Sequence, residues 1–468
     1  MIEVVGIQDG GWALLPAHLR QLVTDADVVV GGRRHLELLP QVEGQERLTW
    51  PRPLRDGLRE LLFHADDHAH GRATSSDAHE TDDAASGRVV VLASGDPLRS
   101  GVATTLIDEF GAGAVRVHPA LSSETLARAR MGWAAESVDV VTTVGRSIER
   151  VRPFVTPRAR LVVLCSDARG PGELAALLVQ SGAPEARLTA WWHLGGPGEG
   201  SLQATAQGWP DGERDLAEPV PDLVLVCVEV PDELGAADVV GTVPGRAETW
   251  FGNDGLITKR DVRAAALARL RPTRGALLWD LGAGSGAVGI EWALAAPDAR
   301  AVAVERDPVR AERARENARA LGVDHRVDVV EASVHDVVAH DVVVHDVVVH
   351  DVFVHGAQHP ADPTDGPGRD GAARGTSDAR DSAPDAVFFG GGLSAEAVDA
   401  ALTALRPGGR LVAHAVTLES ESILLHAWRT RGGDLTRLAV EHLEPLGRLH
   451  GWRPARAVVQ WSYAKDLT

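Results

Sequence analysis

An acidic residue followed by a run of glycines is the pattern in this sequence that most clearly points to chemistry. Residues 277–294, LLWDLGAGSGAVGIEWAL, contain an apolar run that ends near Asp280 and a turn that leads into a helical pattern. The glycines of this turn are Gly282, Gly284 and Gly286. Glycines let the backbone bend sharply and approach a ligand, and free N–H groups at a helix N-terminus favour anionic or polar groups. The next apolar run ends at Glu305, where a carboxylate can accept hydrogen bonds from two ribose hydroxyls, so the pattern predicts a nucleoside-binding loop.

Two cofactors fit such a loop. Gly284-x-Gly286-x-x-Gly289, with an acid about 20 residues on, satisfies the dinucleotide fingerprint and would indicate a nicotinamide-dependent oxidoreductase. An acid just before G-x-G-x-G is instead typical of class I methyltransferases, which use S-adenosylmethionine. Asp280 would repel a pyrophosphate but attract the amino group of a methionine moiety. The sequence therefore favours S-adenosylmethionine, and the oxidoreductase is the alternative.

Two further stretches predict the surroundings of this loop. In FGNDGLITKRDVRAAALARL, residues 251–270, Asp254 and Thr258 can line the mouth of a pocket. The cations before and in the following helical pattern are Lys259, Arg260 and Arg263, of which we expect Arg263 on a solvated helix face. In PDAVFFGGG, residues 384–392, the glycines Gly390, Gly391 and Gly392 follow a buried strand. Ligands bind at the carboxyl ends of such strands, and three glycines there suit a large, flat ligand.

These motifs, together with the V-E-R that ends at Arg306, resemble the decarboxylating precorrin methyltransferase domain of cobalamin biosynthesis. The resemblance implies that the loop residues already named contact S-adenosylmethionine or a tetrapyrrole. The implied cofactor ligands are Thr258, Asp280, Gly282, Gly284, Gly286, Glu305 and Glu331. The family usually has glycine after the last of these acids, where this chain has Ala332.

The first half of the chain has looser signals, in the order GIQDGGWALL, VVVGGRRHLELLP, VLASGDPLRSG and HPALSSETLARARMGW. Ser122 and Ser123 precede a helical pattern, as an ordinary N-cap does. The order and spacing resemble the tetrapyrrole (corrin/porphyrin) methylases, which hold S-adenosylmethionine in a cleft between two α/β subdomains. The resemblance implies cofactor contacts at Gly95, Asp96 and Ser122, and substrate contacts at Arg33 and Arg34.

Three positions depart from that family. The loop from Gly6 to Gly10 lacks the usual proline, TTVGR at 142–146 lacks a histidine before Gly-Arg, and His193 stands where a glutamate is frequent. The fold prediction is unaffected by these departures, which concern the groups that handle protons.

The order of the two domains resembles that of bifunctional enzymes of cobalamin (vitamin B12) biosynthesis. It implies methylation of precorrin-6B at C-5 by the first domain. The second domain would methylate C-15 and decarboxylate the ring C acetate, giving precorrin-8X. Each domain would have one S-adenosylmethionine site. Substrate carboxylates would be bound by Arg33, Arg34, Lys259 and Arg260, and the macrocycle by Gly390, Gly391 and Gly392. The same chemistry on a cobalt-containing precorrin is the alternative, and the catalytic residues stay unknown.

Alternating strand-like and helical patterns position these motifs and predict an α/β protein. The strand-like runs of the first half are 2–7, 26–32, 88–95, 115–120, 138–145, 160–167, 187–192 and 223–230. Those of the second half are 276–284, 299–307, 326–332, 384–392, 408–416 and 455–464. We predict a tetrapyrrole-methylase domain of two α/β subdomains over 1–232, a linker over 233–246 and a class I, Rossmann-like methyltransferase domain over 247–468. Polar loops are expected at about 64–87 and 334–383.

The repeat HDVVAHDVVVHDVVVHDVFVH, residues 335–355, places a histidine at every fifth position. This period distributes the imidazoles over both faces of a strand or around a helix, and it lacks the spacing of zinc motifs. We therefore expect an expansion in a surface connection and no metal site. The alternatives are weak binding at several sites, or a metal-handling protein with degenerate methylase domains.

The remaining properties of the chain narrow the function classes. No apolar run reaches about 18 residues and no signal peptide is visible, so we expect a cytoplasmic protein that does not bind membranes. The net charge of −19 disfavours nucleic acid as a partner, although much of it lies in 64–87 and 332–384. Cys165 and Cys227 lie in apolar runs and are expected to be buried rather than paired. The expected partner is a precorrin-type tetrapyrrole, and we expect a homo-oligomer.

Overall fold

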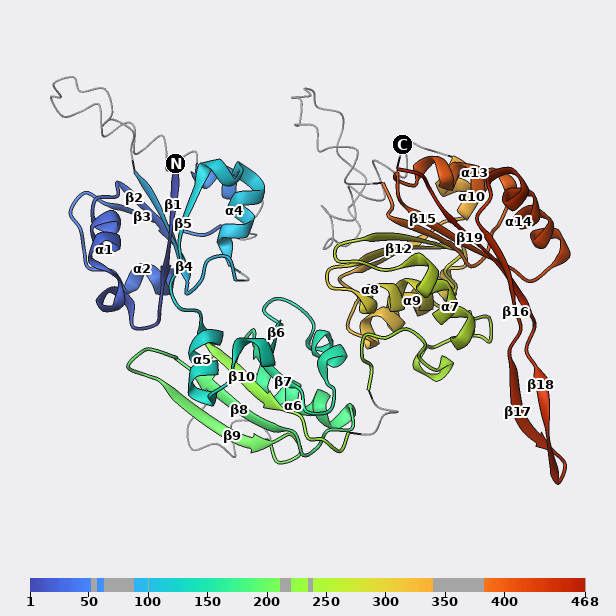
Figure 1. Ribbon diagram of the computed structural model, residues 1–468. Helices are drawn as coiled ribbons and strands as arrows, with labels where there is room; N and C mark the ends of the chain where they lie inside the picture. The colour runs from blue at the N-terminus through green and yellow to red at the C-terminus, as the bar shows by residue number, and fades with distance from the viewer. Residues whose placement is uncertain are drawn as a thin grey trace, which may run out of the picture. The chain divides into compact units, whose positions relative to one another are not determined.

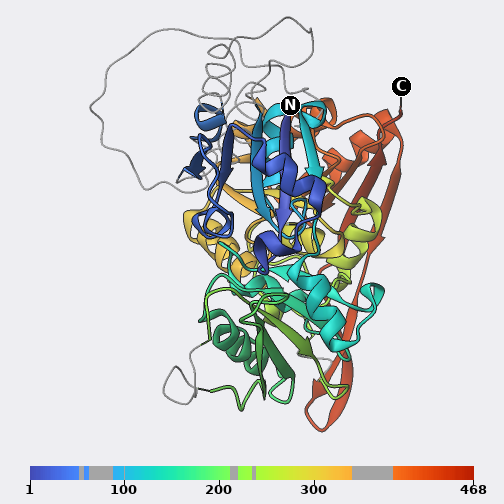
Figure 2. The same cartoon turned by 90° about the vertical axis from the view of Figure 1, so that its left-hand side faces the viewer.

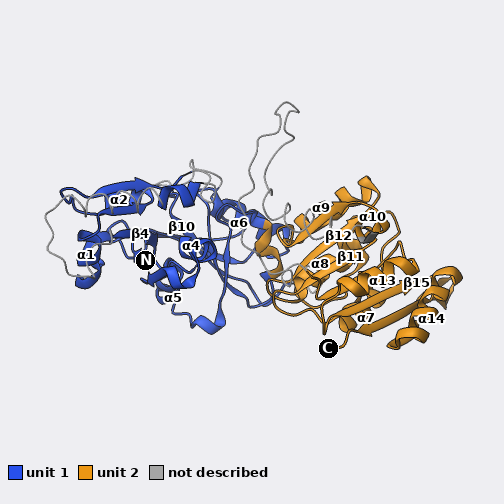
Figure 3. Ribbon diagram, turned by 90° about the horizontal axis from the view of Figure 1, so that it is seen from above, with its two compact units in different colours: residues 1–148, 154–238 blue, residues 149–153, 239–468 orange. Residues whose placement is uncertain are grey.

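The chain divides into two units of similar size, shown in different colours in Figure 3. The computed structural model describes residues 1–51, 57–62, 88–99, 101–210, 220–234, 239–339 and 383–467. Unit 1 comprises Met1–Ile148 and Phe154–Asp238, and unit 2 comprises Glu149–Pro153 and Val239–Thr468. The boundary after Asp238 therefore falls inside the segment predicted as a linker. The predicted loop at 64–87 lies outside the described residues. Of the predicted insertion, the structure describes the first residues, which form α10 (Val334–Ala339), whereas residues 340–382 lie outside the described part.

The first sheet of unit 1 is parallel, and its strand order is β3-β2-β4-β1-β5 (Figure 1). Its strands are β1 (Ile2–Ile7), β2 (Val28–Gly31), β3 (Glu46–Thr49), β4 (Val89–Ser94) and β5 (Val115–His118). The helices of this subdomain include α1 (Ala17–Thr24), α2 (Arg33–Glu37) and α4 (Val102–Phe110). The central strands β1, β2 and β4 are runs of valine, isoleucine and leucine because both faces are buried, against two hydrophobic clusters. Parallel pairing brings the carboxyl ends of β1, β4 and β5 to one edge of the sheet.

The second sheet of unit 1 is mixed, and its strand order is β6-β7-β10-β8-β9. Its strands are β6 (Asp139–Thr142), β7 (Arg160–Leu164), β8 (Arg187–Trp192), β9 (Gly200–Thr205) and β10 (Val224–Glu229). Only the pair β6–β7 is parallel. Helix α5 (Ser123–Met131) packs on β7 and β10, and α6 (Gly170–Gln180) follows β7. Unit 1 thus contains two α/β subdomains, as predicted.

Unit 2 has a seven-stranded sheet in the order β13-β12-β11-β14-β15-β19-β16. Its strands are β11 (Leu277–Leu281), β12 (Arg300–Glu305), β13 (Val327–Glu331), β14 (Ala386–Phe389), β15 (Arg410–Ala415), β16 (Asp434–Leu438) and β19 (Val458–Ala464). Strand β19 is antiparallel to both of its neighbours. The chain order reverses between β11 and β14, and ligands bind outside the carboxyl ends of strands at such a switch point.

Helices cover both faces of this sheet. Besides α10, they are α7 (Arg260–Leu270), α8 (Ala287–Ala295), α9 (Pro308–Ala320), α13 (Ala395–Ala404) and α14 (Leu418–Arg431). One buried cluster joins α7 and α8 to the sheet, with Leu267 and Trp292 among its members. The other joins α13 and α14 to the opposite face through residues such as Val398 and Leu424. The two clusters hold the strand ends of the switch point in fixed register.

All fourteen strand-like runs expected from the sequence contain strands in the structure. The prediction missed β3, β9, β16 and the hairpin of β17 (Glu441–Leu446) and β18 (Leu449–Pro454). This hairpin extends away from the seven-stranded sheet in both views of the ribbon (Figures 1 and 2). Its large apolar side chains Leu443, Leu446, Leu449 and Trp452 are 57–72% exposed.

Candidate active sites of the two units

The glycine loop of unit 2 lies directly against the triple glycine that follows β14. Gly282, Gly284 and Gly286 have φ angles of 71°, 58° and 74°, a region that favours glycine. A Cβ on Gly282 would lie 2.6 Å from the nitrogen and 2.7 Å from the Cα of Gly391. The Gly390 N–H donates to the Leu281 carbonyl at 2.9 Å. The predicted cofactor loop and the predicted substrate loop therefore meet, backbone to backbone, at the switch point.

Asp280 lies beneath this contact and is 1% exposed. Its Oδ2 accepts a hydrogen bond from the Gly289 N–H at 2.8 Å. Its Oδ1 is buried and has no hydrogen-bond partner among the described residues. Burial raises the pKa of Asp280 to about 7. A buried acceptor without a partner beside a glycine loop fits a cationic ligand group, such as the ammonium of S-adenosylmethionine.

Glu305, at the end of β12, is 6% exposed and stabilises the same loop. Its Oε2 accepts from the Gly284 N–H at 2.8 Å and its Oε1 from the Asp307 N–H at 3.0 Å. Each carboxylate oxygen has a second lone pair, so these bonds leave capacity for ribose hydroxyls. Glu331 is the ladder partner of Glu305 on β13, and its side chain is exposed at the same edge of the sheet.

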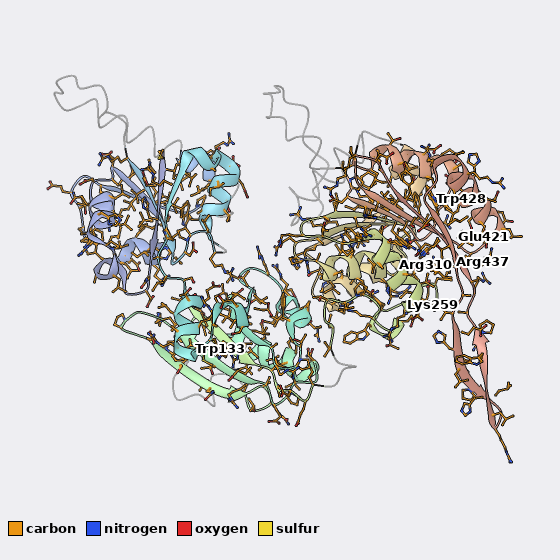
Figure 4. The ribbon with its side chains drawn as sticks, in the orientation of Figure 1. Trp133, Lys259, Arg310, Glu421, Trp428 and Arg437 are labelled. Atoms are coloured by element: carbon orange, nitrogen blue, oxygen red, sulfur yellow. The ribbon has the colours of Figure 1, made fainter. Side chains whose placement is uncertain are left out.

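The segment before α7 approaches the glycine loop. A Cβ on Gly284 would lie 3.5 Å from the Leu256 carbonyl oxygen, and the nearby Thr258 is half-buried. Asp254 accepts from Arg310 Nε on α9 at 2.8 Å, and this hydrogen bond holds the pKa of Asp254 below its usual range. Lys259 and Arg260 are exposed at the start of α7 (Lys259 and Arg310 are labelled in Figure 4). Asp254 thus anchors the segment that carries the predicted substrate cations.

The expectation for Arg263 is wrong, because its side chain is fully buried. It belongs to the stripe of α7 that faces the core, with Ala266, Leu267 and Leu270. Its Nη2 lies 3.2 Å from Glu291 Oε1 on α8, and its Nη1 donates to the Thr258 carbonyl at 2.5 Å. The buried carboxylate of Glu291 also accepts from the Gly245 and Arg246 N–H groups. Arg263 is therefore a structural cation that fixes the Thr258 segment.

In unit 1, three strand ends meet in the same backbone-to-backbone manner. The Gly95 N–H donates to the Ile7 carbonyl at 3.0 Å, and the Gly95 carbonyl accepts from the Ala120 N–H at 3.1 Å. A Cβ on Gly6 would lie 2.1 Å from the Gly95 oxygen. A pocket of about 410 Å³ lies beside this junction and is lined by residues that include Gly6, Gln8, Pro119 and Leu121. The predicted cofactor residue Gly95 thus adjoins a cavity.

Asp96 and Ser122 use their side chains within their own loops. Asp96 Oδ1 accepts from the Leu98 N–H at 2.9 Å. Ser122 Oγ accepts from the Thr125 N–H at 3.2 Å and caps α5. These bonds fix the orientation of both side chains within their loops.

Arg33 and Arg34 differ in their surroundings. Arg33 is exposed at the start of α2, whereas Arg34 Nη1 donates to Asp9 Oδ1 at 2.6 Å. Asp9 was not singled out as a site residue in the sequence. The signal that could have indicated it is its position in the loop that directly follows β1. Arg34 is therefore already paired with a carboxylate of the protein.

Among the described residues, no group of three or more histidine, cysteine, aspartate or glutamate side chains could hold a metal ion. The repeat beyond Ala339 lies outside those residues. Within the same described part of the chain, no helix is both long and apolar enough to cross a bilayer. Cys165 and Cys227 are buried and unpaired, as predicted, and burial raises the pKa of each thiol to about 12.

Two family matches lie on either side of the boundary after Asp238. Residues 1–208 match the tetrapyrrole (corrin/porphyrin) methylases, and residues 249–360 and 369–465 match the precorrin methyltransferase domain. The fold and the loop geometry therefore define a two-domain methyltransferase. The chain is 37% identical to a Sinorhizobium precorrin-6Y C(5,15)-methyltransferase (decarboxylating) over 465 residues, which cover 99% of this chain and 96% of that protein. It belongs to the precorrin-6Y C(5,15)-methyltransferase (decarboxylating) family.

Shorter relatives each match less than half of the chain. A cobalt-precorrin-7 C(5)-methyltransferase of Salmonella typhimurium is 31% identical, and the match covers 39% of this chain and 79% of that protein. A cobalt-precorrin-6B C(15)-methyltransferase (decarboxylating) of the same organism is 28% identical, with coverage of 43% and 85%. One of these relatives is thus named for methylation at C-5 and the other for methylation at C-15.

Proposed function

We propose that this chain methylates precorrin-6B at C-5 and C-15 and decarboxylates its ring C acetate, giving precorrin-8X. Family membership supports the type of reaction. The structural observation that carries the proposal is Asp280, whose buried Oδ1 has no partner among the described residues and lies beside the glycine loop. This arrangement favours a cofactor with a cationic head over a dinucleotide, because Asp280 would repel a pyrophosphate.

The residues of unit 2 would position two ligands at the switch point. S-adenosylmethionine, when bound, supplies an electrophilic methyl group. Asp280 would bind its amino group and Glu305 its ribose, while the loop of Gly390, Gly391 and Gly392 would adjoin the macrocycle. Lys259 and Arg260 would bind peripheral carboxylates of the substrate. An electron-rich meso carbon needs alignment and exclusion of water rather than a strong base for the methyl transfer itself.

We assign C-5 to unit 1 and C-15 with decarboxylation to unit 2. The separate names of the shorter relatives and the two family matches support this division. Loss of carbon dioxide needs an electron sink, which the conjugated macrocycle supplies. Unit 2 would have to orient the acetate, and its exposed cations before and at the start of α7 are suited to that task.

Mass spectrometry of the product tests the reaction. Purified chain, incubated with precorrin-6B and S-adenosylmethionine, is expected to add two methyl groups and remove one carbon dioxide. The metal-free substrate is our proposal, and a parallel reaction with the cobalt-containing precorrin tests the alternative. No mass change with either substrate would refute the proposed function.

Calorimetric titration with S-adenosylhomocysteine tests the two cofactor sites. We expect two molecules bound per chain, one in each unit. Asp280→Ala removes the buried carboxylate oxygen beside the unit 2 loop that has no partner among the described residues, so this variant is expected to bind one. Two molecules bound by the variant, or binding of NADH with similar affinity, would contradict the assignment of the loop.

We also propose that the chain self-associates through the hairpin of β17 and β18. A two-stranded ribbon is marginally stable in water, and its outer edges offer free hydrogen-bonding groups. Among the described residues, no other strand pairs with it. Strand β17 carries Glu441 and Glu444, whereas β18 carries Arg453, which pairs with Glu444 of the same hairpin at 3.1 Å, and Arg456 follows β18. Antiparallel pairing of β17 with β18 of a second copy would therefore place opposite charges together.

Sedimentation velocity tests the self-association. The wild-type chain is expected to sediment as an oligomer, and the double variant Leu446→Asp, Trp452→Asp as a monomer, since both side chains are about 70% exposed. Leu418→Asp is the matched control, because Leu418 is 79% exposed on α14. A monomeric wild-type chain would exclude this role for the hairpin.

A further inference from the structure

A histidine and a carboxylate from the two subdomains of unit 1 meet between the sheets. Asp9 lies in the loop after β1, and His193 follows β8. His193 Nδ1 and Asp9 Oδ2 are 3.2 Å apart, although the two residues are 184 positions apart in the sequence. Neither residue was predicted to bind the cofactor or the substrate. Arg34, which pairs with Asp9, was predicted to bind the substrate.

The backbone around this pair is closely packed. A Cβ on Gly196 would lie 2.3 Å from Asp9 Oδ2, and a Cβ on Gly10 would lie 2.9 Å from the Gly195 carbonyl oxygen. His193 has a φ of 49°, in the left-handed region that few residues other than glycine adopt, although histidine, asparagine and aspartate do so more often than most. Left-handed backbone of this kind is common in turns and at functional sites. The turn is therefore built to hold the imidazole against Asp9.

The hydrogen bonds determine which ring nitrogen of His193 is available. The Asp9 carboxylate can only accept, so Nδ1 of the neutral ring carries the proton and Nε2 has a free lone pair. Arg34 Nη1 donates to the other oxygen of Asp9 at 2.6 Å. The side chain of Asp9 is 15% exposed and that of His193 is 34% exposed, so the ring remains accessible to a ligand. A carboxylate that orients an imidazole with a free nitrogen is the arrangement of a general base.

The neighbouring histidine does not compete for this role. His35 Nε2 lies 2.9 Å from Ser94 Oγ and 3.1 Å from Arg34 Nη2. Burial and the adjacent Arg34 lower the pKa of His35 to about 4, so this ring is neutral near pH 7. Three charged groups face the turn that carries His193, namely Asp9, Arg34 and Glu199. Glu199 accepts a hydrogen bond from the Gly195 N–H and pairs with Arg130.

The position of the pair connects it to the pocket of unit 1. Gly6, Gln8 and Gly11 line the pocket of about 410 Å³, and Asp9 lies in the same loop between them. A ligand in that pocket would contact the loop that orients His193. In the proposed reaction, the methylated meso carbon still carries a hydrogen, so a proton acceptor is required close to the methyl-transfer site.

We propose that His193, oriented by Asp9, is the base that removes the meso proton during methylation at C-5; this inference rests on the proposed function. The π electrons of the meso carbon form the new C–CH₃ bond while the S–CH₃ bond breaks, and the sulfur leaves as a neutral thioether. The cationic macrocycle then loses its meso C–H proton to His193 Nε2. The electrons of that bond restore the conjugated, uncharged macrocycle, and the imidazolium, paired with Asp9, releases its proton to solvent.

Two variants test the base, and unit 2 provides an internal control. His193→Asn retains a residue that tolerates the left-handed backbone, and Asp9→Asn removes the orienting charge. For His193→Asn, we expect kcat for C-5 methylation to fall by roughly 10²–10⁴-fold, the usual contribution of a general base, with KM for both substrates changed less than about two-fold. Methylation at C-15 and loss of carbon dioxide should continue, so a product with one added methyl accumulates.

His118→Asn is the matched control, because His118 is also a histidine paired with a carboxylate. Its Nε2 lies 2.8 Å from Glu3 Oε2, and both residues belong to the first sheet of unit 1. This variant is expected to leave C-5 methylation unchanged. Retention of two S-adenosylhomocysteine molecules per chain shows that His193→Asn has folded. In the chain labelled with ¹⁵N-histidine, the His193 signals, identified by their absence from His193→Asn, should report a protonated Nδ1 and an unprotonated Nε2. Asp9→Asn should shift these signals and lower kcat.

Three results would contradict the assignment of His193 as the base. They are a wild-type C-5 rate in His193→Asn, a raised KM with unchanged kcat, and an equal loss of activity in His118→Asn. If the wild-type chain adds two methyl groups and His193→Asn does so at the same rate, the role of His193 as the base is rejected and the proposed function stands. A wild-type chain that adds none rejects the proposed function and the base together.

Discussion

At the scale of single residues, Asp280 links the cofactor site to the stability of unit 2. Its pKa of about 7 lies well above that of an unfolded aspartate, so between about pH 4 and pH 7 the folded chain keeps a proton that the unfolded chain has released. This group therefore makes the free energy of unfolding fall as pH rises through that window, by at most about 1.4 kcal/mol per pH unit.

Asp280→Asn is expected to reduce this fall. The amide oxygen can still accept from the Gly289 N–H, and the variant carries no charge at any pH. Urea unfolding of both chains at pH 5, 6 and 7 measures the difference, with the variant gaining stability relative to wild type as pH rises. Parallel pH profiles would contradict the raised pKa.

Arg263 and Arg274 allow a comparison of a buried and an exposed ion pair. Arg263→Ala removes one of the two buried cations that pair with the Glu291 carboxylate, the other being Arg246 at 3.7 Å. It should lower the free energy of unfolding by as much as about 3–5 kcal/mol. Arg274→Ala, the control, breaks an exposed pair with Asp298 and should change it by less than about 1 kcal/mol. Chemical denaturation measures both, and similar losses would show that the Glu291 cluster contributes little.

At the scale of elements, the contact between the loops after β11 and β14 predicts different effects for two glycines with the same backbone. Gly282 and Gly275 both have a φ of 71°. A Cβ on Gly275 meets nothing within 4 Å, whereas one on Gly282 meets the Gly391 backbone. Gly275→Ala should therefore cost about 1–2 kcal/mol for its backbone alone. Gly282→Ala should cost more and weaken S-adenosylhomocysteine binding in unit 2 at least ten-fold.

Denaturation and calorimetric titration distinguish these effects. The control variant Gly275→Ala is expected to bind two S-adenosylhomocysteine molecules with wild-type affinity. If Gly282→Ala binds equally well, the two loops do not form one ligand site.

The elements that could be predicted from the sequence are those whose signal is local. Strands such as β11 and β14 are continuous apolar runs because both faces are buried. Strands β17 and β18 are exposed and include Pro445 and Pro454, so neither burial nor alternation marked them.

The site shows the same limit. Asp280, Glu305 and the glycines follow from spacing along the chain. The burial of Arg263 depends on Glu291 from another helix, and the Asp9–His193 pair depends on two sheets meeting. Such partners are set by tertiary packing, which a single sequence does not reveal.

At the scale of the whole molecule, the division after Asp238 predicts two separable activities. Both hydrophobic clusters of unit 2 consist of residues after Val239, so a fragment of residues 239–468 is expected to fold. This fragment should add one methyl group and remove carbon dioxide, and a fragment of residues 1–238 should restore the second methylation when mixed with it.

Mass spectrometry of the products checks this outcome. A fragment that binds S-adenosylhomocysteine but cannot decarboxylate the substrate would show that the reaction needs both units in one chain. The Glu149–Pro153 segment, which clusters with unit 2, is absent from the 239–468 fragment and is the first addition to test.

The position of β19 between β15 and β16 has a consequence for synthesis on the ribosome. Both neighbours are made earlier, so a nascent chain that has reached only Pro454 cannot join β16 to the rest of the sheet. Until residues 458–464 emerge, β15 keeps an open edge, and such edges promote aggregation. Unit 1 can complete both of its sheets well before that time. Chaperones would therefore be needed mainly during translation of the last strands of unit 2.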